Sequence, residues 1–390
     1  MVGGKFPDMA LSEHRGVWFF PTTVRFGAGR LEELAAEMQR MAMVKPLVVT
    51  DSGLSAIGLA QKVIDAAGQR GAIGNLFDQV SENPTDIDVY AGVERFRELD
   101  CDGVIAVGGG SGLDCGKAIA LISGVGGTLD RFLWPETGSE QERSPFPIIA
   151  IPTTAGTGAE VEASSMITMT ERQVKGAVVQ SSLLPKLVIA DPVLTLSLPR
   201  HLTAWTGMDA LSHNLESLCV PDYHPMADSI ATEGAQLCMK WLAAAVDDGS
   251  NLAARSSMMV AAMMGATAFV KGLGAMHALS HAIGGLHATQ HGLTNAILMP
   301  HVLKFNRPLI EEKISDLASR CDLAHGFDGF LTAVEALQDR IGIHQRLSDI
   351  GVPKTSFDAI VSRAQVDGCA GTNPRPLDRD NLLTLLQAAH

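Results

Sequence analysis

Carboxylate and imidazole side chains recur at a spacing that suits a metal ion. The segment 207–213 (GMDALSH) places Asp209 four residues before His213, and His277 lies four residues before His281. On a helix, residues at this spacing share one face, so each pair can close on a single cation. Either pair alone is explained at least as well by an ordinary hydrogen bond. Together, and with four histidines in the fifteen residues that begin at His277, they predict a mixed nitrogen and oxygen site for zinc or iron(II).

Two loops rich in glycine or threonine are candidates for binding a dinucleotide. Residues 107–117 (VGGGSGLDCGK) and residues 152–158 (PTTAGTG) each follow an apolar run. Glycine lets the backbone approach a phosphate closely, and the N-terminus of a following helix offers free N–H groups. Neither common phosphate motif is complete, because Leu113 replaces the third glycine of GxGxxG and Ala118 replaces the Ser or Thr of a P-loop. The first loop alone could be an ordinary strand-to-helix turn, but the pair predicts a dinucleotide crevice.

Asp51 directly follows the apolar run 46–50 (PLVVT). At the end of a strand, an acidic side chain can accept hydrogen bonds from a ribose hydroxyl and repel a 2′-phosphate. An aspartate at this place is also a common helix N-cap. Spacing alone favours the N-cap.

The first half of the chain is predicted to be an α/β domain with a parallel sheet. Apolar, β-branched runs that are continuous rather than alternating predict strands buried on both faces. Alternation of such strands with helices indicates a parallel sheet covered by helices. The predicted strands are 46–50, 104–107, 148–151 and 187–190, and the predicted helices are 30–41 and 55–67.

The second half is predicted to be helical. After about Pro192 no segment up to His390 predicts a strand. Helix-like periodicity with many Ala, Leu and Met residues occurs at 199–219, 227–245, 251–269 and 331–341. We therefore predict a dinucleotide-binding α/β domain at 1–192 and an all-α, metal-binding and catalytic domain at 193–390. The site is expected in the cleft between them.

Composition argues against several classes of function. The 390 residues carry a formal net charge of −13, which would repel a nucleic-acid backbone. The most apolar stretch, 258–270, is too short to span a bilayer, and residues 1–10 show no signal-peptide pattern. The six cysteines are scattered without a CxxC pair, which argues against a zinc ribbon or a disulfide framework. A globular protein of the reducing cytoplasm is expected, with neither nucleic acid nor a membrane as partner.

Across nearly its whole length the chain resembles the iron-containing (group III) alcohol dehydrogenase family. The segments that carry the resemblance are 26–29 (FGAG), 83–85 (NPT), 108–117, 152–158, 191–192 (DP), 207–213, 272–274 (GLG), His277 with His281, 291–292 (HG) and 372–375 (TNPR). The resemblance implies a Rossmann-like α/β N-terminal domain and an all-α C-terminal domain, the fold shared with dehydroquinate synthase. It also implies a homo-oligomer, with a dimer expected, that transfers hydride between NAD(H) and a primary alcohol or aldehyde.

Matched position by position, the resemblance implies roles for particular residues. One divalent metal, Fe(II) with Zn(II) as the alternative, would be held by Asp209, His213, His277 and His291. NAD would be bound by Asp51, Asn83, Gly109, Gly110, Ser111, Asp114, Thr153, Thr154, Thr157 and Lys175. Asp51 falls where the family chooses between cofactors, and it favours NAD over NADP. The metal would act as a Lewis acid on the alcohol oxygen, and His281 would be the catalytic group that relays the proton.

Two departures from the common family pattern concern the substrate. His287 stands where many members have an aromatic residue, and we interpret it as part of the pocket wall. Lys271 is typical of a subgroup in which some members act on ω-hydroxy acids such as 4-hydroxybutyrate. Lys271 could therefore pair with a substrate carboxylate, although a solvated lysine explains it as well. A polyol dehydrogenase, a dehydroquinate-synthase-like lyase and a cofactor-free metallohydrolase remain alternatives.

Overall fold

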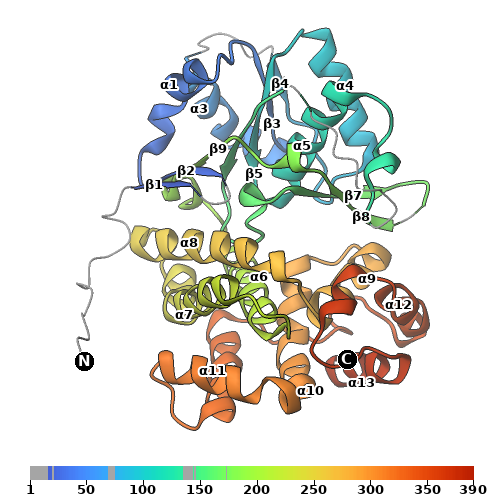
Figure 1. The fold of residues 1–390 in the computed structure, drawn as a ribbon. Helices are drawn as coiled ribbons and strands as arrows, with labels where there is room; N and C mark the ends of the chain where they lie inside the picture. Colours follow the sequence, from blue (N-terminus) through green and yellow to red (C-terminus); the bar gives the residue numbers. More distant parts are fainter. Residues whose placement is uncertain (1–15, 20–21, 69–74, 135–143, 145, 173) are drawn as a thin grey trace.

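A computed structural model describes residues 16–19, 22–68, 75–134, 144, 146–172 and 174–390. The described residues form two halves that lie one above the other in Figure 1. The upper half contains all the strands, and the lower half is helical. The predicted fold class is therefore confirmed.

A seven-stranded sheet lies at the centre of the upper half. Its strand order is β1-β2-β9-β6-β5-β3-β4, and every neighbouring pair is parallel except β1 with β2. The bounds are Gly16–Phe19 (β1), Thr23–Phe26 (β2), Pro46–Val49 (β3), Leu76–Phe77 (β4), Gly103–Gly108 (β5), Ile148–Pro152 (β6) and Leu187–Ala190 (β9). The four strands predicted from continuous apolar runs are β3, β5, β6 and β9. All four are buried on both faces.

Helices cover both faces of this sheet, because alternate residues of its central strands belong to two different cores. Ile105 and Val107 of β5 pack with the helices α1 and α3, whereas Val104 and Ala106 pack with α4 and α5. The predicted helix 55–67 is divided at Gly58, whose φ of 79° ends one helix before the next begins. The bounds are Leu34–Arg40 (α1), Ser52–Ala56 (α2), Leu59–Ala66 (α3), Asp86–Glu98 (α4) and Gly110–Val125 (α5).

A separate antiparallel hairpin, β7 (Ser164–Met169) with β8 (Val174–Val179), was not predicted. It lies at the edge of the upper half that faces α9 (Figure 1). Thr168 of β7 forms a bridge with Thr85, and its N–H donates to Pro84 O at 2.8 Å. The hairpin thus joins the turn at 83–85 to the cleft side of the sheet.

The lower half is built from eight α-helices, and no strand occurs among the described residues after Ala190. They are Arg200–Cys219 (α6), Pro225–Asp247 (α7), Leu252–Ala268 (α8), Ala275–His287 (α9), His291–Arg320 (α10), Gly326–Ile341 (α11), Phe357–Ala364 (α12) and Arg379–Ala389 (α13). Helices α6, α8 and α9 lie closest to the sheet half (Figure 1). All four helices predicted here are present, as α6, α7, α8 and α11.

The most apolar helical run is longer than the sequence suggested. Leu252–Lys271 is 20 residues long with a mean hydropathy of 1.2, so by length and composition it could cross a membrane. It is formed by α8 and a 3-10 turn at Phe269–Lys271. However, 72% of its most apolar 18-residue stretch is buried inside the protein. Burial against α6 and α7 explains its apolar character, because a core helix is apolar all round.

Candidate metal centre and cofactor crevice

Helix α6 carries three ionisable side chains into the core of the helical half. Asp209, His213 and Glu216 are each no more than 5% exposed. They share one face because they are spaced by four and three residues. Glycine on the neighbouring helix makes room for them: a Cβ at Gly265 of α8 would lie 2.9 Å from the His213 Cβ. The close approach of α6 and α8 therefore depends on this glycine.

Helices α9 and α10 bring the other histidines to the same place. His277 is in the first turn of α9, and its ring stacks on that of His213 with centroids 4.5 Å apart. His291 is the first residue of α10, which is capped by Gln290. A Cβ at Gly292 would lie 2.2 Å from Trp205 O, so only glycine lets α10 begin this close to α6.

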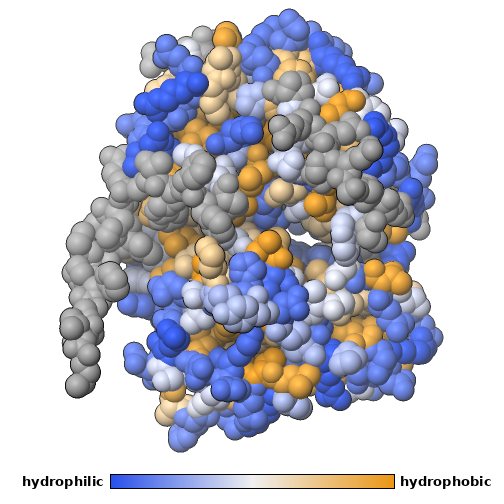
Figure 2. Space-filling view, in the orientation of Figure 1, coloured by the Kyte–Doolittle hydropathy of each residue, from blue (hydrophilic) through white to orange (hydrophobic). Residues whose placement is uncertain are grey.

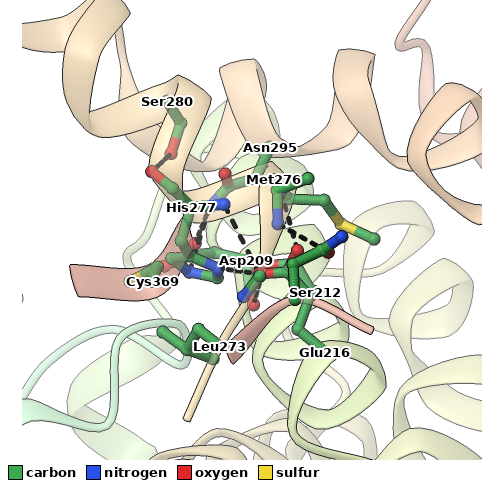
Figure 3. Close-up of polar contacts among 12 residues, drawn as sticks. Asp209, Ser212, Glu216, Leu273, Met276, His277, Ser280, Asn295 and Cys369 are labelled. Atoms are coloured by element: carbon green, nitrogen blue, oxygen red, sulfur yellow. Dashed lines mark hydrogen bonds and ion pairs between the residues drawn. The ribbon is translucent and has the colours of Figure 1, made fainter. Parts of the chain in front are cut away.

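The four predicted ligands converge. Single donor atoms of Asp209, His213 and His277 all lie within 4.8 Å of one another, and His291 Nε2 is 3.5 Å from Asp209 Oδ1. Asn295, one turn further along α10, points its amide into the same group (Figure 3). Its Nδ2 donates to Asp209 Oδ1 at 2.8 Å and lies 3.1 Å from His291 Nε2 and 3.3 Å from His277 Nε2.

Burial keeps the three imidazoles neutral near pH 7. It lowers the pKa of His213 and of His277 to about 4, although the nearby Asp209 opposes both shifts. Burial, helped by the neighbouring His277 and His281, lowers the pKa of His291 well below its usual range. Neutral imidazole and ionised carboxylate are the forms that bind metals, so no ligand histidine needs to lose a proton first.

Glu216 holds His277 from the side opposite Asp209. Its Oε2 accepts from His277 Nδ1 at 2.7 Å and from Gly274 N at 2.9 Å, and its Oε1 accepts from Met276 N at 2.7 Å. Figure 3 shows the carboxylate below the first turn of α9. Because Nδ1 donates to Glu216, Nε2 of His277 keeps its lone pair for a metal. Sequence reasoning missed Glu216, although its position three residues after His213 was a usable signal.

His281 has a carboxylate partner, Asp367, which the sequence analysis did not predict. Its Nδ1 lies 3.0 Å from Oδ2 of Asp367, and its ring stacks on that of His291 with centroids 5.4 Å apart. Burial alone would raise the pKa of Asp367, but hydrogen bonds from His281 and from Cys369 bring it below its usual range. A charged Asp367 keeps a proton on Nδ1 of His281 and leaves Nε2 free to accept one.

The predicted cofactor loops touch each other where β5 and β6 end. A Cβ at Gly109 would lie 3.1 Å from Thr154 Cγ2, and one at Gly110 would lie 2.9 Å from Thr157 Cγ2. Both glycines belong to the start of α5, whose first-turn N–H groups have no side-chain cap. Glycine backbone and an uncapped helix N-terminus facing a second loop are suited to a pyrophosphate.

The other predicted cofactor residues in the two loops have internal partners. Thr153 is buried, and its backbone N–H donates to Gly108 O at 2.9 Å. Ser111 donates to Glu82 O beside the turn at 83–85. Asp114 accepts from Lys117 Nζ at 2.9 Å and from Met166 N at 3.1 Å, so it ties α5 to the hairpin.

Asp51, Asn83 and Lys175 lie around the same crevice. Asp51 caps α2, accepting from Leu54 N at 3.0 Å through one carboxylate oxygen. Asn83 is exposed. Lys175 on β8 is half-buried, and burial lowers its pKa although Asp114 and Asp209 oppose the shift. Lys175 lies on β8, which packs against α9, the helix that carries His277 and His281.

The structure does not bring the two predicted substrate residues into the cluster. The side chain of Lys271 is inaccessible, and its ammonium pairs with Asp228 of α7. Its charge is therefore already neutralised, which departs from the expected role of binding a substrate carboxylate. His287 is the last residue of α9, and its buried Nε2 has no hydrogen-bond partner among the described residues.

The side chains present fit a divalent metal. One carboxylate and three neutral imidazoles are the donor types that bind Zn(II) or Fe(II). The Nδ1 atom of His213 is buried and has no hydrogen-bond partner among the described residues. A Cβ at Gly156 would lie 2.7 Å from Thr206 Cβ, so the second loop packs directly on α6, the helix that carries Asp209 and His213. Figure 2 shows a hollow between the two halves at the right of the view.

Comparison with known proteins agrees with this arrangement. The sequence profile described as "Iron-containing alcohol dehydrogenase" matches residues 21–192, and that of the "Fe-containing alcohol dehydrogenase family, C-terminal" matches residues 203–390. The chain is 38% identical over 367 residues to a 4-hydroxybutyrate dehydrogenase of Cupriavidus necator, covering 92% of this chain and 95% of that protein. It is 36% identical over 385 residues to a 1,3-propanediol dehydrogenase of Citrobacter freundii, covering 95% and 98%.

Solved structures show the same fold. A crystal structure of a 1,3-propanediol oxidoreductase superposes with a TM-score of 0.88 at 34% identity, covering 97% of this chain and 99% of that one. A sulfoacetaldehyde reductase from Bifidobacterium kashiwanohense, solved in complex with NAD+, superposes with a TM-score of 0.86 at 30% identity, covering 95% and 97%. With both halves matched in sequence and in structure, the chain belongs to the iron-containing alcohol dehydrogenase family.

Proposed function

We propose that the protein transfers hydride between NAD(H) and a primary alcohol or aldehyde, with one divalent metal, Fe(II) or Zn(II), held by Asp209, His213, His277 and His291. The observation that carries the proposal is the convergence of these four side chains next to the two glycine and threonine loops, which touch each other and pack through Gly156 on Thr206 of α6. A metallohydrolase would not need the two loops, which are suited to a dinucleotide.

The ligand residues would position the substrate oxygen. The bound cation supplies Lewis acidity, which lowers the pKa of an alcohol. Asp209 contributes the one negative charge among the four ligands, so a divalent cation held by them would keep a net positive charge. Glu216 and Asn295 hold His277 and Asp209 in place, which reduces reorganisation during the reaction.

The sheet half would hold the dinucleotide. Gly109, Gly110 and Ser111 present backbone N–H groups for the pyrophosphate, with Asp114 bracing the loop, and the threonines at 153, 154 and 157 line the nicotinamide side. Asn83 and Lys175 would contact the ribose near the nicotinamide. Asp51 uses one carboxylate oxygen as a helix cap, which leaves the other for the adenosine ribose and disfavours a 2′-phosphate.

His281 would move the proton. Its Nδ1 is held by Asp367 at 3.0 Å, so Nε2 is the ring nitrogen left to exchange a proton with the substrate. In alcohol oxidation Nε2 accepts the proton that leaves the substrate hydroxyl, and in aldehyde reduction it returns that proton.

Reconstitution tests the proposal. The purified protein is loaded with Fe(II) or Zn(II) without oxygen, and NADH formation is followed with short primary alcohols, diols and 4-hydroxybutyrate, with NADP in parallel. Metal-dependent NADH formation is expected. His277→Ala should abolish turnover and keep NADH binding, whereas the exposed His344 serves as control in His344→Ala. Turnover by His277→Ala, or no reduction of either cofactor by loaded wild type, would overturn the proposal.

A second candidate is oxidation of an ω-hydroxy acid, favoured by the similarity to a 4-hydroxybutyrate dehydrogenase. Because Lys271 is paired with Asp228, it can bind a substrate carboxylate only if that pair opens. Comparing kcat/KM for 4-hydroxybutyrate and 1-butanol in wild type and Lys271→Met separates the cases. A selective loss for the acid assigns the carboxylate to Lys271, and an equal loss for both substrates assigns a structural role.

We also propose a cytoplasmic homodimer with a domain boundary at residues 192/193. All six cysteines are free, as a reducing compartment allows. Among the described residues β1 is the outermost strand at one edge of the sheet, where a second copy could pair. Light scattering after size exclusion tests the dimer, fractionation of the source cells tests the compartment, and limited proteolysis tests the boundary.

A further inference from the structure

A second group of metal-binding side chains lies beside the four-ligand centre. One donor atom each from His281, Asp367 and Cys369 lies within 4.8 Å of the other two. All three residues are half-buried, so a cation can reach them from solvent, whereas Asp209, His213 and His277 are buried. Cys369 is labelled at the left of the close-up in Figure 3, beside His277.

We propose that His281, Asp367 and Cys369 form a second metal site, which binds thiophilic divalent cations such as Zn(II) or Cd(II) and inhibits the enzyme when it is occupied. The metal-binding part stands on its own. The inhibitory part rests on the proposed function, because it requires His281 to move a proton.

The donor atoms determine which cations fit. A thiolate, an imidazole and a carboxylate are the three ligand types of protein zinc sites, and three protein ligands leave one tetrahedral position for water. Sulfur selects soft or borderline cations over Mg(II), Mn(II) and Ca(II), which prefer oxygen. The four-ligand centre contains no sulfur, so only the second site can form a metal–thiolate bond.

The charges of the group agree with this selectivity. Asp367 remains ionised and supplies a permanent negative charge. Burial raises the pKa of the Cys369 thiol well above its ordinary value, and the nearby Asp367 and Glu216 raise it further. A cation must therefore displace the thiol proton, and only a cation that bonds strongly to sulfur offsets that cost.

The backbone holds the ligands in place before a cation arrives. Asp367 and Cys369 are two residues apart on one turn, which the Asp367 side chain caps by accepting from Cys369 N at 2.8 Å. Gly368 between them lies under the ring of Trp134 from the sheet half, because a Cβ there would be 2.1 Å from Trp134 Cζ3. This turn packs against α9, which supplies His281.

Occupancy would interrupt the proton path. A cation on this site takes Nδ1 of His281 or the Asp367 oxygen that holds the Nδ1 proton. The imidazole then loses the partner that makes Nε2 a base. Positive charge is also added next to His291, whose ring stacks on His281.

A cadmium titration tests the site without any turnover. Protein loaded with one equivalent of Zn(II) is kept reduced with a phosphine and titrated with Cd(II), while the ultraviolet sulfur-to-cadmium charge-transfer band is recorded. The band should grow to saturation at one thiolate-bound Cd(II) per chain. Cys369→Ser should remove the band. Cys321→Ser, which changes the other half-buried cysteine, should keep it.

Three outcomes would overturn the metal site: no band in wild type, an equal band in Cys369→Ser, or loss of the band in Cys321→Ser. Metal analysis should show one tightly held Zn(II) in all three proteins, which excludes misfolding as the cause of a lost band.

Turnover tests the inhibition. Zn(II) added beyond one equivalent should inhibit wild type at least about tenfold more strongly than Cys369→Ser, each compared with its own rate without added zinc. Equal inhibition would overturn the inhibitory role and leave the cadmium result standing. If no alcohol is oxidised at all, the proposed function fails, and the cadmium titration still decides whether the site exists.

Discussion

Replacing Glu216 with glutamine tests whether this buried carboxylate controls the metal centre. The Glu216 carboxylate accepts from His277 Nδ1, Gly274 N and Met276 N, all at 2.9 Å or less. An amide has one oxygen, so the NH2 end must face at least one N–H donor. If it faces Met276, α9 loses one cap hydrogen bond. If it faces Nδ1 of His277, the ring changes tautomer and Nε2 loses the lone pair that a metal needs.

The loss of metal affinity or of folding stability can be estimated for each arrangement. Loss of an outer partner of a metal-binding histidine lowers metal affinity about 10–100-fold, which corresponds to about 1.4–2.8 kcal/mol. An unsatisfied buried N–H at the start of α9 costs the fold about 1–3 kcal/mol. Glu216→Gln should therefore bind Zn(II) at least about tenfold more weakly in competition with a chelating dye. The exposed Glu233 provides the control variant Glu233→Gln.

The metal affinity of the wild type should depend on pH in a defined direction. Burial raises the pKa of Glu216 to about 7, whereas His213 and His277, with a pKa of about 4, do not titrate there. Metal binding favours ionised Glu216, so the affinity of wild type should rise as pH increases from 6 to 8. The variant, which lacks this ionisable carboxyl beside His277, should show a flatter profile. Equal affinity of the two proteins, or an unchanged rise with pH in Glu216→Gln, would refute this account of the centre.

Three further predictions follow from other contacts. Asp367→Asn should lower kcat at least about tenfold with unchanged metal content, because Nδ1 of the relay histidine loses its charged acceptor; steady-state kinetics with metal analysis checks this, and an unaltered kcat contradicts it. Asp51→Ala should improve kcat/KM with NADP relative to NAD and cost about 1 kcal/mol as a lost helix cap, measured by cofactor kinetics and thermal unfolding. Gly265→Val should destabilise the protein by about 1–3 kcal/mol and weaken zinc binding, because its Cβ would meet His213 at 2.9 Å; a normal urea midpoint would show that α8 can move aside.

The sequence predicted the fold wherever a strand is buried on both faces. β3, β5, β6 and β9 were found because continuous apolar runs have one interpretation in an alternating α/β chain. β7 was missed because half of its residues are polar, including the buried Ser165, and β4 because it has only two residues. The hairpin matters to the site, since Lys175 lies on it, but its pairing depends on contacts with the turn at 83–85.

Spacing predicted only part of the proposed ligand set. The two pairs at four-residue spacing are local, so the sequence shows them directly, but spacing paired His277 with His281, and only the family resemblance indicated His291. The role of these residues as ligands stays a prediction. Glu216 lies 61 residues from its partner His277, and Asp367 lies 86 residues from His281. The spacing of Glu216 from His213 places the two on one helix face, but no local pattern pairs Glu216 with His277 or Asp367 with His281. The pairing of Lys271 with Asp228, 43 residues away, was also out of reach of a local pattern, and its substrate role stays a prediction.

The proposed metal ligands come from three helices, and Asn295 contacts Asp209 across 86 residues of chain. A cation at this centre would cross-link α6, α9 and α10. Its ligands on α6 and α9 are separated by tens of residues in the sequence. Whatever binds only the folded state raises its population by mass action. Scarcity of metal in a cell would then reduce the amount of this protein as well as its activity, since chains that open more often are degraded sooner. The abundance of the protein would thus follow the metal supply without any dedicated regulator.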